Sequence, residues 1–171
     1  MTVNTCVYGN NDCLSYSVSH GAPVDARVCA AAVSLTLIDS TIVMKEKVNT
    51  AVEALRMFKH ARSLGCPWDS STTIAAARVG AKGALFYALE HGCPCTVDAC
   101  IAAAEGGHLC CLQLLHEHGC PWDERVAQTA AARRSASCLR YCVEHGCPID
   151  QATMEEYNRL SATPAISTVV G

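Results

Sequence analysis

Cysteine and histidine are the residues of this chain that could carry chemistry, and they recur together. The 171 residues include 13 cysteines and seven histidines, and three of the histidines precede a Gly-Cys-Pro segment, at His91, His118 and His145. Zinc needs four ligands within about 2.0–2.3 Å of one point, whereas each His-Gly-Cys triplet offers two and the triplets lie 27 residues apart. We therefore expect no metal site. The histidines are interpreted as partners of helix C-terminal dipoles. The buried spacers are expected to be Cys66, Cys93, Cys120 and Cys147.

The closely spaced cysteines do not resemble a redox motif or a nucleophilic site. Cys93-Pro94-Cys95 is one residue short of Cys-x-x-Cys, and Cys110 and Cys111 would point in different directions on a helix. Nucleophilic catalysis needs a base and an orienting group around the nucleophile in a cleft, and repetition by itself places many Cys and His residues in the chain. No Gly-rich phosphate loop, His-Glu-x-x-His or Gly-x-Ser-x-Gly segment is present. We expect no enzyme activity and no cofactor.

Composition argues against a secreted disulfide scaffold and against a nucleic-acid partner. The cysteine count is odd, and residues 1–8 lack the basic stretch and apolar run of a secretory signal. No segment approaches the roughly 18–20 apolar residues of a membrane span. We expect free thiols in a reducing compartment, the cytoplasm first, with the nucleus left open. The net charge is −3, and acids and bases are interspersed, so no basic surface for nucleic acid is expected.

The cysteines belong to a 27-residue repeat. A Gly-Cys-Pro segment begins at Gly65, Gly92, Gly119 and Gly146. An alanine triplet at 75–77 recurs at 102–104 and, displaced by one position, at 130–132. Leucines also keep the register, seven residues before the next glycine, at Leu85, Leu112 and Leu139. A period of about 20–50 residues is typical of stacked repeat units, because a unit of this length cannot bury its apolar face alone.

Each unit is predicted to form two short antiparallel helices. Asp69, Asp123 and Asp150 follow a proline by two residues and are expected to cap the alanine-rich helix A. Gly80 and Gly107 would lie in the turn to helix B, which ends at a glycine in the left-handed conformation. Both helices are below the roughly 12–15 residues at which an isolated helix becomes marginal in water. Stability must therefore come from contacts between units.

One column of the repeat changes its residue from unit to unit. Trp68, Cys95, Trp122 and Ile149 each stand three residues after the repeat glycine. Because the position accepts several apolar shapes, we interpret it as a buried contact between units. An exposed aromatic anchor for a partner is the alternative for the two tryptophans.

The segment from Gly107 to Gly119, GHLCCLQLLHEHG, resembles helix B and the C-terminal glycine of ankyrin repeats, and the alanine run before it resembles ankyrin helix A. Ankyrin units have about 33 residues and open with Thr-Pro-Leu-His, where this chain has a 27-residue period and Pro-Trp-Asp. The missing residues fall where the family builds its projecting hairpin. The resemblance, to short ankyrin-like repeats of a Gly-Cys-Pro-Trp-Asp type, implies an all-α, ankyrin-like solenoid of stacked antiparallel helix pairs with shortened β-hairpin fingers.

We expect a single repeat domain over residues 1–162 and a C-terminal tail over 163–171. Its units would span 1–20 (partial), 21–64, 65–91, 92–118, 119–145 and 146–162, the last acting as a cap. The 21–64 unit carries an insertion at about 35–51, and helical spacing of apolar residues from Met44 predicts a helix from about Thr41 to Ser63. A degenerate half-unit and a partner-specific element explain the insertion equally well.

The candidate partner-binding residues are polar positions that differ between units. The resemblance to ankyrin implies that helix A and its flanking loops line the concave side of the stack. The candidates at the start of helix A are Ser70, Ser71, Thr73, Asp98, Glu124, Arg125 and Gln128. Those in the turns between helices are Arg78, Lys82, Glu105, His108, Arg133 and Arg134.

These observations predict a non-catalytic scaffold that binds another protein through its concave surface. No nucleic acid, membrane or small-molecule substrate is expected as a partner. A substrate-recruiting adaptor of the ubiquitin-ligase type is one alternative, and a Cys/His metal- or redox-responsive protein is another. Bound metal or native disulfides would favour the last.

Overall fold

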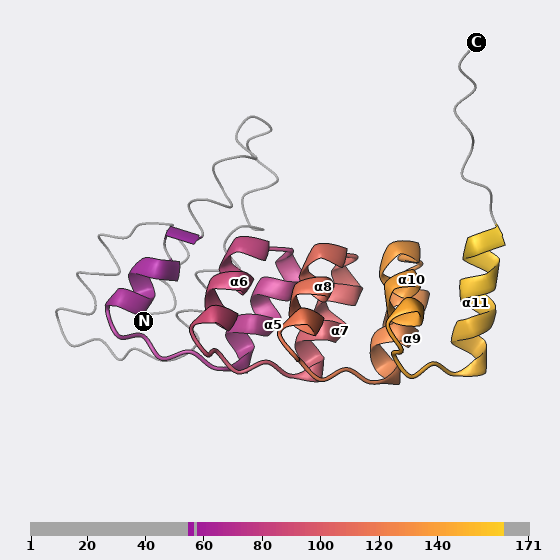
Figure 1. The fold of residues 1–171 in the computed structure, drawn as a ribbon. Coiled ribbons are helices and arrows are strands. Elements are labelled where there is room, and N and C mark those ends of the chain that lie inside the picture. Colours follow the sequence, from indigo (N-terminus) through magenta and orange to yellow (C-terminus); the bar gives the residue numbers. More distant parts are fainter. Residues whose placement is uncertain (1–54, 57, 163–171) are drawn as a thin grey trace, which may run out of the picture.

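The fold is built from helices. A computed structural model describes residues 55, 56 and 58–162, which form eight helices and no strand (Figure 1). A first helix, described at residues 55, 56 and 58–63 and called the 55–63 helix below, is followed by α5 (Ser70–Val79), α6 (Lys82–Glu90), α7 (Val97–Gly106), α8 (Leu109–Glu117), α9 (Glu124–Ala132), α10 (Ala136–Glu144) and α11 (Gln151–Ala162). The all-α prediction is therefore confirmed for this part of the chain.

Several predictions fall on residues that the structure does not describe. These are the units before residue 55, the insertion at about 35–51, the helix expected from Thr41 as far as residue 54, and the tail at 163–171. Among the helices that the structure does describe, none has the length and apolarity needed to cross a membrane.

The helices form pairs that follow one another in a row (Figure 1). The first members, α5, α7 and α9, lie against one another in sequence, and α11 contacts α9 at the end. The second members, α6, α8 and α10, contact one another in the same order, and each packs on the first helix of its own pair. The 27-residue period of the sequence is thus also the period of the helix pairs.

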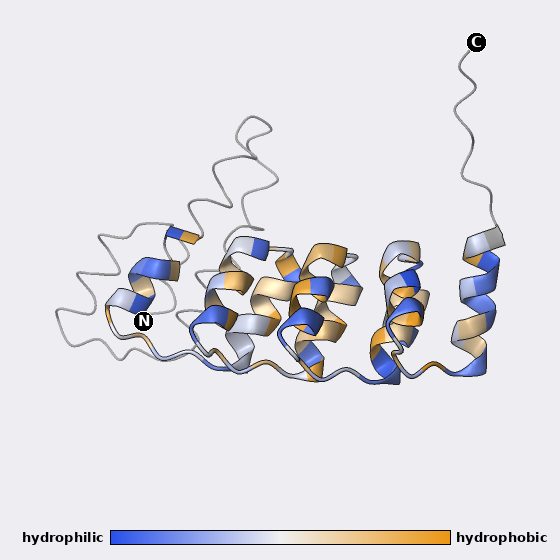
Figure 2. Ribbon diagram, viewed as in Figure 1, coloured by the Kyte–Doolittle hydropathy of each residue, from blue (hydrophilic) through white to orange (hydrophobic). Residues whose placement is uncertain are grey.

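The repeated apolar columns form the core between the pairs. Phe58, Leu85, Leu112 and Leu139 occupy one column, and none of them is exposed. Most alanines of α5, α7 and α9 are buried, and small side chains let neighbouring first helices approach closely; the buried ones are Ala76, Ala77, Ala99, Ala102, Ala103, Ala104, Ala127 and Ala130. Hydrophilic residues are frequent on α11, which ends the row (Figure 2). This is the composition expected of a capping helix.

Aspartates cap the first helices at the three positions predicted, and one further first helix is an exception among these helices. Asp69 accepts a hydrogen bond from the Ser71 amide at 2.9 Å, and Asp123 accepts one from the Arg125 amide at 3.0 Å. Asp150 accepts one from the amide of residue 153 at 2.8 Å. The exception is α7, where Thr96 holds the cap position without a side-chain hydrogen bond to the helix.

The turn between the two helices of a pair requires a left-handed residue. Gly80 and Gly107 take this conformation with φ of 71° and 68°, and Arg134 takes it in the next unit with φ of 55°. A side chain at a left-handed position brings Cβ close to the following carbonyl oxygen. The third turn therefore carries a backbone strain that glycine avoids in the other two.

Arg134→Gly is expected to raise the free energy of unfolding by about 1 kcal/mol, since glycine removes the left-handed strain. Urea unfolding measures the change. Arg134→Ala is the matched control, because it removes the charge and keeps the strain, and it should give no such gain. Equal gains in the two variants would show that the charge, and not the backbone, is responsible.

Acid should weaken the helix caps. The Arg125 side-chain hydrogen bond lowers the pKa of Asp123, and hydrogen bonds from Thr153 lower the pKa of Asp150, from an ordinary value of 3.8. A carboxyl whose pKa is lowered by folding stabilises the fold above its unfolded-state pKa and loses that contribution as the pH falls through the folded pKa. We expect the urea midpoint to fall between about pH 5 and pH 2. Asp150→Asn, which keeps a capping oxygen without a charge, should show a smaller fall, and an unchanged slope would exclude this carboxyl as a contributor.

Candidate functional site

Ser71, Asp98 and Arg125 form a line across the layer of first helices. Each is the second residue of its helix, and the helices α5, α7 and α9 lie side by side. Asp98 and Arg125 are exposed, and Ser71 is half-buried. The hydrogen bond and charge of Asp123 raise the pKa of Arg125, and Asp98 on the neighbouring helix adds to this effect. Charges from adjacent units therefore act on one another at this surface.

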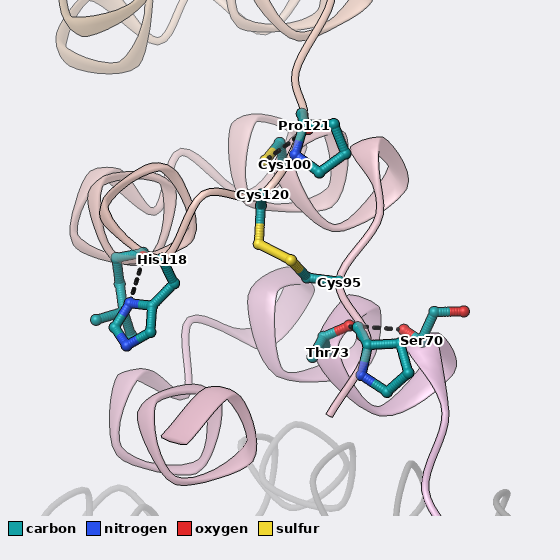
Figure 3. Close-up of a disulfide and its surroundings, with 9 residues drawn as sticks. Ser70, Thr73, Cys95, Cys100, His118, Cys120 and Pro121 are labelled. Carbon is teal, nitrogen blue, oxygen red and sulfur yellow. Dashed lines mark hydrogen bonds between the residues drawn. A yellow bond between two sulfur atoms is a disulfide. The ribbon is translucent and has the colours of Figure 1, made fainter. Parts of the chain in front are cut away.

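The prediction that Thr73 binds a partner is wrong, because this side chain is buried. Its Oγ1 lies 2.9 Å from the carbonyl oxygens of both Ser70 and Pro94, and the hydroxyl donates to one of them (Figure 3). The equivalent positions in the next units are Cys100 and Ala127, which are also buried. Comparison of this column across units could have shown that Thr73 belongs to the interior.

Two further candidates are half-buried and engaged within the chain. Gln128 Nε2 donates to Asp150 Oδ2 at 3.1 Å, and the equivalent positions in the two preceding units are isoleucines that pack on the core. The His108 ring lies against Gly80 and Gly106, so close that a Cβ at either glycine would collide with it. The His108 ring therefore packs the turn of its own unit against the turn of the preceding unit.

The remaining candidates fall into two groups at opposite ends of the first helices. A ten-residue helix is about 15 Å long, so that distance separates the groups. Near the helix starts are Ser70, Ser71, Asp98, Glu124 and Arg125. In the turns are Arg78, Lys82, Arg133 and Arg134, which are exposed, and Glu105, which is half-buried. The structure thus places the candidates along the helix A layer without bringing them into one compact patch.

The histidines before the repeat glycines cap their helices, as predicted. Nδ1 lies 2.8 Å from the carbonyl oxygen four residues earlier at His91, 2.9 Å at His118 and 3.0 Å at His145. Because a carbonyl oxygen only accepts, Nδ1 is the donor in each case. Within the described residues, no three His, Cys, Asp or Glu side chains are grouped so that they could hold a metal ion.

The tryptophans pack between units. The Arg62 guanidinium lies 4.4 Å from the Trp68 ring, and the His116 ring stacks on Trp122 with 4.0 Å between centroids. Arg62 and His116 stand at the same position of the helix that precedes each tryptophan. Both tryptophans remain half-buried. The inter-unit contact is therefore as predicted, although it is made at the edge of the core.

A disulfide joins Cys95 and Cys120, with 5.7 Å between their Cα atoms (Figure 3). The expectation that all thiols are free is wrong for this pair, and Cys120 is more than a buried spacer. Successive loops lie side by side, so the residue three positions after one repeat glycine meets the cysteine that lies 25 residues further along. The equivalent pairs are Trp68 with Cys93 and Trp122 with Cys147. Only the middle pair among these has two cysteines, and this coincidence of columns was the available sequence signal.

The other loop cysteines are buried thiols, as predicted. Cys93 Sγ donates to the Asp69 carbonyl at 3.2 Å, and Cys147 Sγ donates to the Asp123 carbonyl at 3.3 Å. Burial raises the pKa of Cys93 to about 11 and that of Cys100 to about 12. Since the thiolate is the reactive form, Cys93 and Cys100 are poor nucleophiles at neutral pH.

A pocket of about 340 Å³ lies between the 55–63 helix and α6, away from the α5–α7–α9 surface. It is lined by Leu55, Lys59, Gly83, Phe86, Tyr87, Glu90 and His91. His91 Nδ1 is already donating to its own helix, and the lining includes no hydroxyl or thiol of Ser, Thr or Cys. The pocket therefore lacks a nucleophile–base pair of that kind.

Alkylation of the folded protein at pH 8 should modify Cys110 before Cys93, Cys100 and Cys111. Cys110 is exposed, whereas burial raises the pKa of Cys93, Cys100 and Cys111 to about 11, 12 and 11. Mass spectrometry of peptides after iodoacetamide treatment measures the order, and the same reaction in urea is the control in which the free thiols react alike. Rapid modification of Cys100 in the folded protein would contradict the burial.

Comparison with known proteins identifies no family for this chain. No protein-family model matches it, and no curated protein matches it. The likeness to ankyrin repeats therefore depends on the residues of the repeat alone.

Proposed function

We propose that this chain is an ankyrin-like solenoid with shortened loops in place of hairpin fingers, and that it binds a partner protein without catalysing a reaction. The 27-residue period and the row of helix pairs support the architecture. Among the described residues, the loops between units are six residues long and contain no strand, which supports the shortening.

The line of Ser71, Asp98 and Arg125 carries the proposal. In three successive units this position holds a hydroxyl, an acid and a base. By contrast, the position two residues later in each helix is buried in all three units. Buried columns must keep their packing, whereas an exposed column is free to vary with the partner it meets. Because helix packing already fixes the backbone beneath these side chains, little conformational entropy is lost when a partner binds.

The chemistry of this surface favours a protein over other classes of partner. The line holds an acid on α7 and a base on α9, which suits the mixed charge of a protein surface and not the uniform charge of a nucleic acid. No cofactor, membrane or small-molecule substrate is part of the proposal. The compartment proposed is a reducing one, the cytoplasm or the nucleus.

One alternative gains support from a specific observation. The Cys95–Cys120 disulfide favours a redox-responsive protein, whereas no grouping of described side chains favours a metal-responsive one. Redox response and partner binding are compatible, because the disulfide lies in the loops that begin α7 and α9.

Arg125→Glu is expected to weaken partner capture by at least about tenfold, in the range found for charged contacts at protein interfaces. Its unfolding temperature should change by less than about 2 °C, because the ion pair it makes with Asp123 is exposed and such pairs contribute little. Affinity capture from the source cell, quantified by mass spectrometry against the wild type, measures the first effect, and thermal unfolding measures the second.

Arg140→Glu is the matched control, since Arg140 is an exposed arginine on α10, in the other helix layer. It should leave capture unchanged. Equal loss in both variants would indicate a general charge effect and would count against the helix A surface. A large fall in the unfolding temperature of Arg125→Glu would make this residue structural.

A further inference from the structure

The loop before α7 lacks the aromatic contact that the loops on either side of it make. Trp68 packs on Arg62, and Trp122 packs on His116, each bridging to the preceding helix. At the equivalent position the middle loop has Cys95, whose side chain is bonded forward to the next loop. The middle loop is therefore held by a covalent bond in the place where its neighbours have a stack.

The same loop also lacks a side-chain cap. Asp69 and Asp123 accept hydrogen bonds from the first turns of α5 and α9. Thr96 makes no such bond to α7, and its Oγ1 is buried without a hydrogen-bond partner. The start of α7 thus depends mainly on the disulfide. The starts of α5 and α9 are each held by more than one contact.

The repeat supplies a bonding arrangement for Cys120 in the reduced state. Cys93 and Cys147 each donate to the carbonyl oxygen of the residue 24 positions earlier, at 3.2 and 3.3 Å. The residue 24 positions before Cys120 is Thr96, which stands at the same place in its loop. A Cys120 thiol released from Cys95 therefore has an acceptor already in place.

We propose that Cys95 and Cys120 form a reversible redox site that switches the start of α7 between a covalently tied and a hydrogen-bonded state. Disulfides in reducing compartments are usually transient or redox-sensing, which agrees with the compartment proposed for this chain. Cys95 is partly exposed and Cys120 is buried, so a small thiol reaches the site at Cys95.

Reduction by such a thiol proceeds in two exchanges. A reductant thiolate attacks Cys95 Sγ, the disulfide breaks, and Cys120 Sγ leaves as a thiolate and takes up a proton. A second reductant thiolate then attacks the reductant sulfur of the mixed disulfide, and Cys95 leaves as a thiolate and is protonated. The protein gains two electrons and two protons, while two reductant thiols become one disulfide. Cys93 and Cys100 compete poorly with the reductant for attack on the disulfide, because burial raises the pKa of their thiols.

The switch lies next to the proposed binding line. Asp98 follows Cys95 by three residues, and Arg125 follows Cys120 by five. Reduction therefore frees the start of α7 relative to α9 at the point where the two charges face a partner. This consequence rests on the proposed binding surface, whereas the redox step does not.

The disulfide is detected directly by peptide mapping of the purified full chain, equilibrated in glutathione buffers of increasing reducing strength and then alkylated. No Lys or Arg lies between Lys82 and Arg125, so trypsin leaves both cysteines on one peptide. Cleavage after glutamate separates them into peptides 91–105 and 118–124. We expect these peptides to be linked under oxidising conditions, to separate in native reducing buffer, and to relink on return to glutathione disulfide.

Two variants assign the response. Cys95→Val removes the link and keeps an apolar residue in a column that also holds Ile149, so it should abolish the linked peptides. Cys93→Ser alters the nearest loop cysteine, keeps a donor for its carbonyl partner, and should leave the linkage and its reversal intact.

Thermal unfolding and hydrogen exchange report what the link does. Reduction should lower the unfolding temperature of the wild type by about 5–10 °C and leave Cys95→Val unchanged. Amide exchange should accelerate at residues 92–100 and much less in the loops at 119–123 and 146–150, which keep their aspartate caps.

A link that never forms, or that resists glutathione until the protein unfolds, would overturn the proposal. So would an equal reductant response in Cys95→Val, or faster exchange spread over all loops. None of these measurements uses a partner, so their failure leaves the binding surface standing. Loss of that surface in the Arg125→Glu experiment leaves the redox site standing.

Discussion

The packing of each helix pair on its neighbours is the interaction on which this structure depends. Most of the helices that follow residue 69 have nine or ten residues, too few to be stable alone in water. They are held by buried alanines between the first helices and by the column of Phe58, Leu85, Leu112 and Leu139 between the second helices. Because each pair packs on its neighbours at the same spacing, every residue position recurs as a row across the described pairs. Interior rows must keep their packing, and exposed rows are free to differ.

The loops between pairs show how one junction can be made in different ways. In the loops before α5 and α9, a tryptophan stacks on a side chain of the preceding helix, and an aspartate caps the helix that follows. The carbonyl oxygen of that aspartate also accepts a hydrogen bond from a cysteine thiol of the next loop. The loop before α7 replaces the stack and the cap with a bond between Cys95 and Cys120. The opening of a noncovalent junction depends on the strength of its packing contacts, whereas a disulfide junction depends on the redox state of its surroundings. One junction of the row is therefore chemically different from its neighbours while the helix geometry is the same.

The contrast between Ser71 and Thr73 shows how the fold separates scaffold from surface. The two residues lie on the same turn of α5, and both carry a hydroxyl. Thr73 Oγ1 lies 2.9 Å from the Pro94 carbonyl oxygen of the next loop, while Ser71 begins a row that continues with Asp98 and Arg125 at the surface. The proposed function uses the second kind of row, because changing it does not disturb the packing. The turns between helices also differ from unit to unit. Arg134 occupies a left-handed backbone position that is glycine in two other turns.

The sequence by itself determined the features that depend on neighbouring residues and on the period. These include the helix pairs, the caps at Asp69 and Asp123, the left-handed glycines and the capping histidines, since each is decided by contacts within a few positions of the chain. Only the tertiary structure decided which columns meet across units. It paired Cys95 with Cys120, buried Thr73, engaged Gln128 and His108 within the chain, and divided the remaining candidates between the two ends of the first helices. The reason is that burial and cross-linking depend on the distance between residues some 25 positions apart, which the stacking of the helices sets and no local pattern encodes.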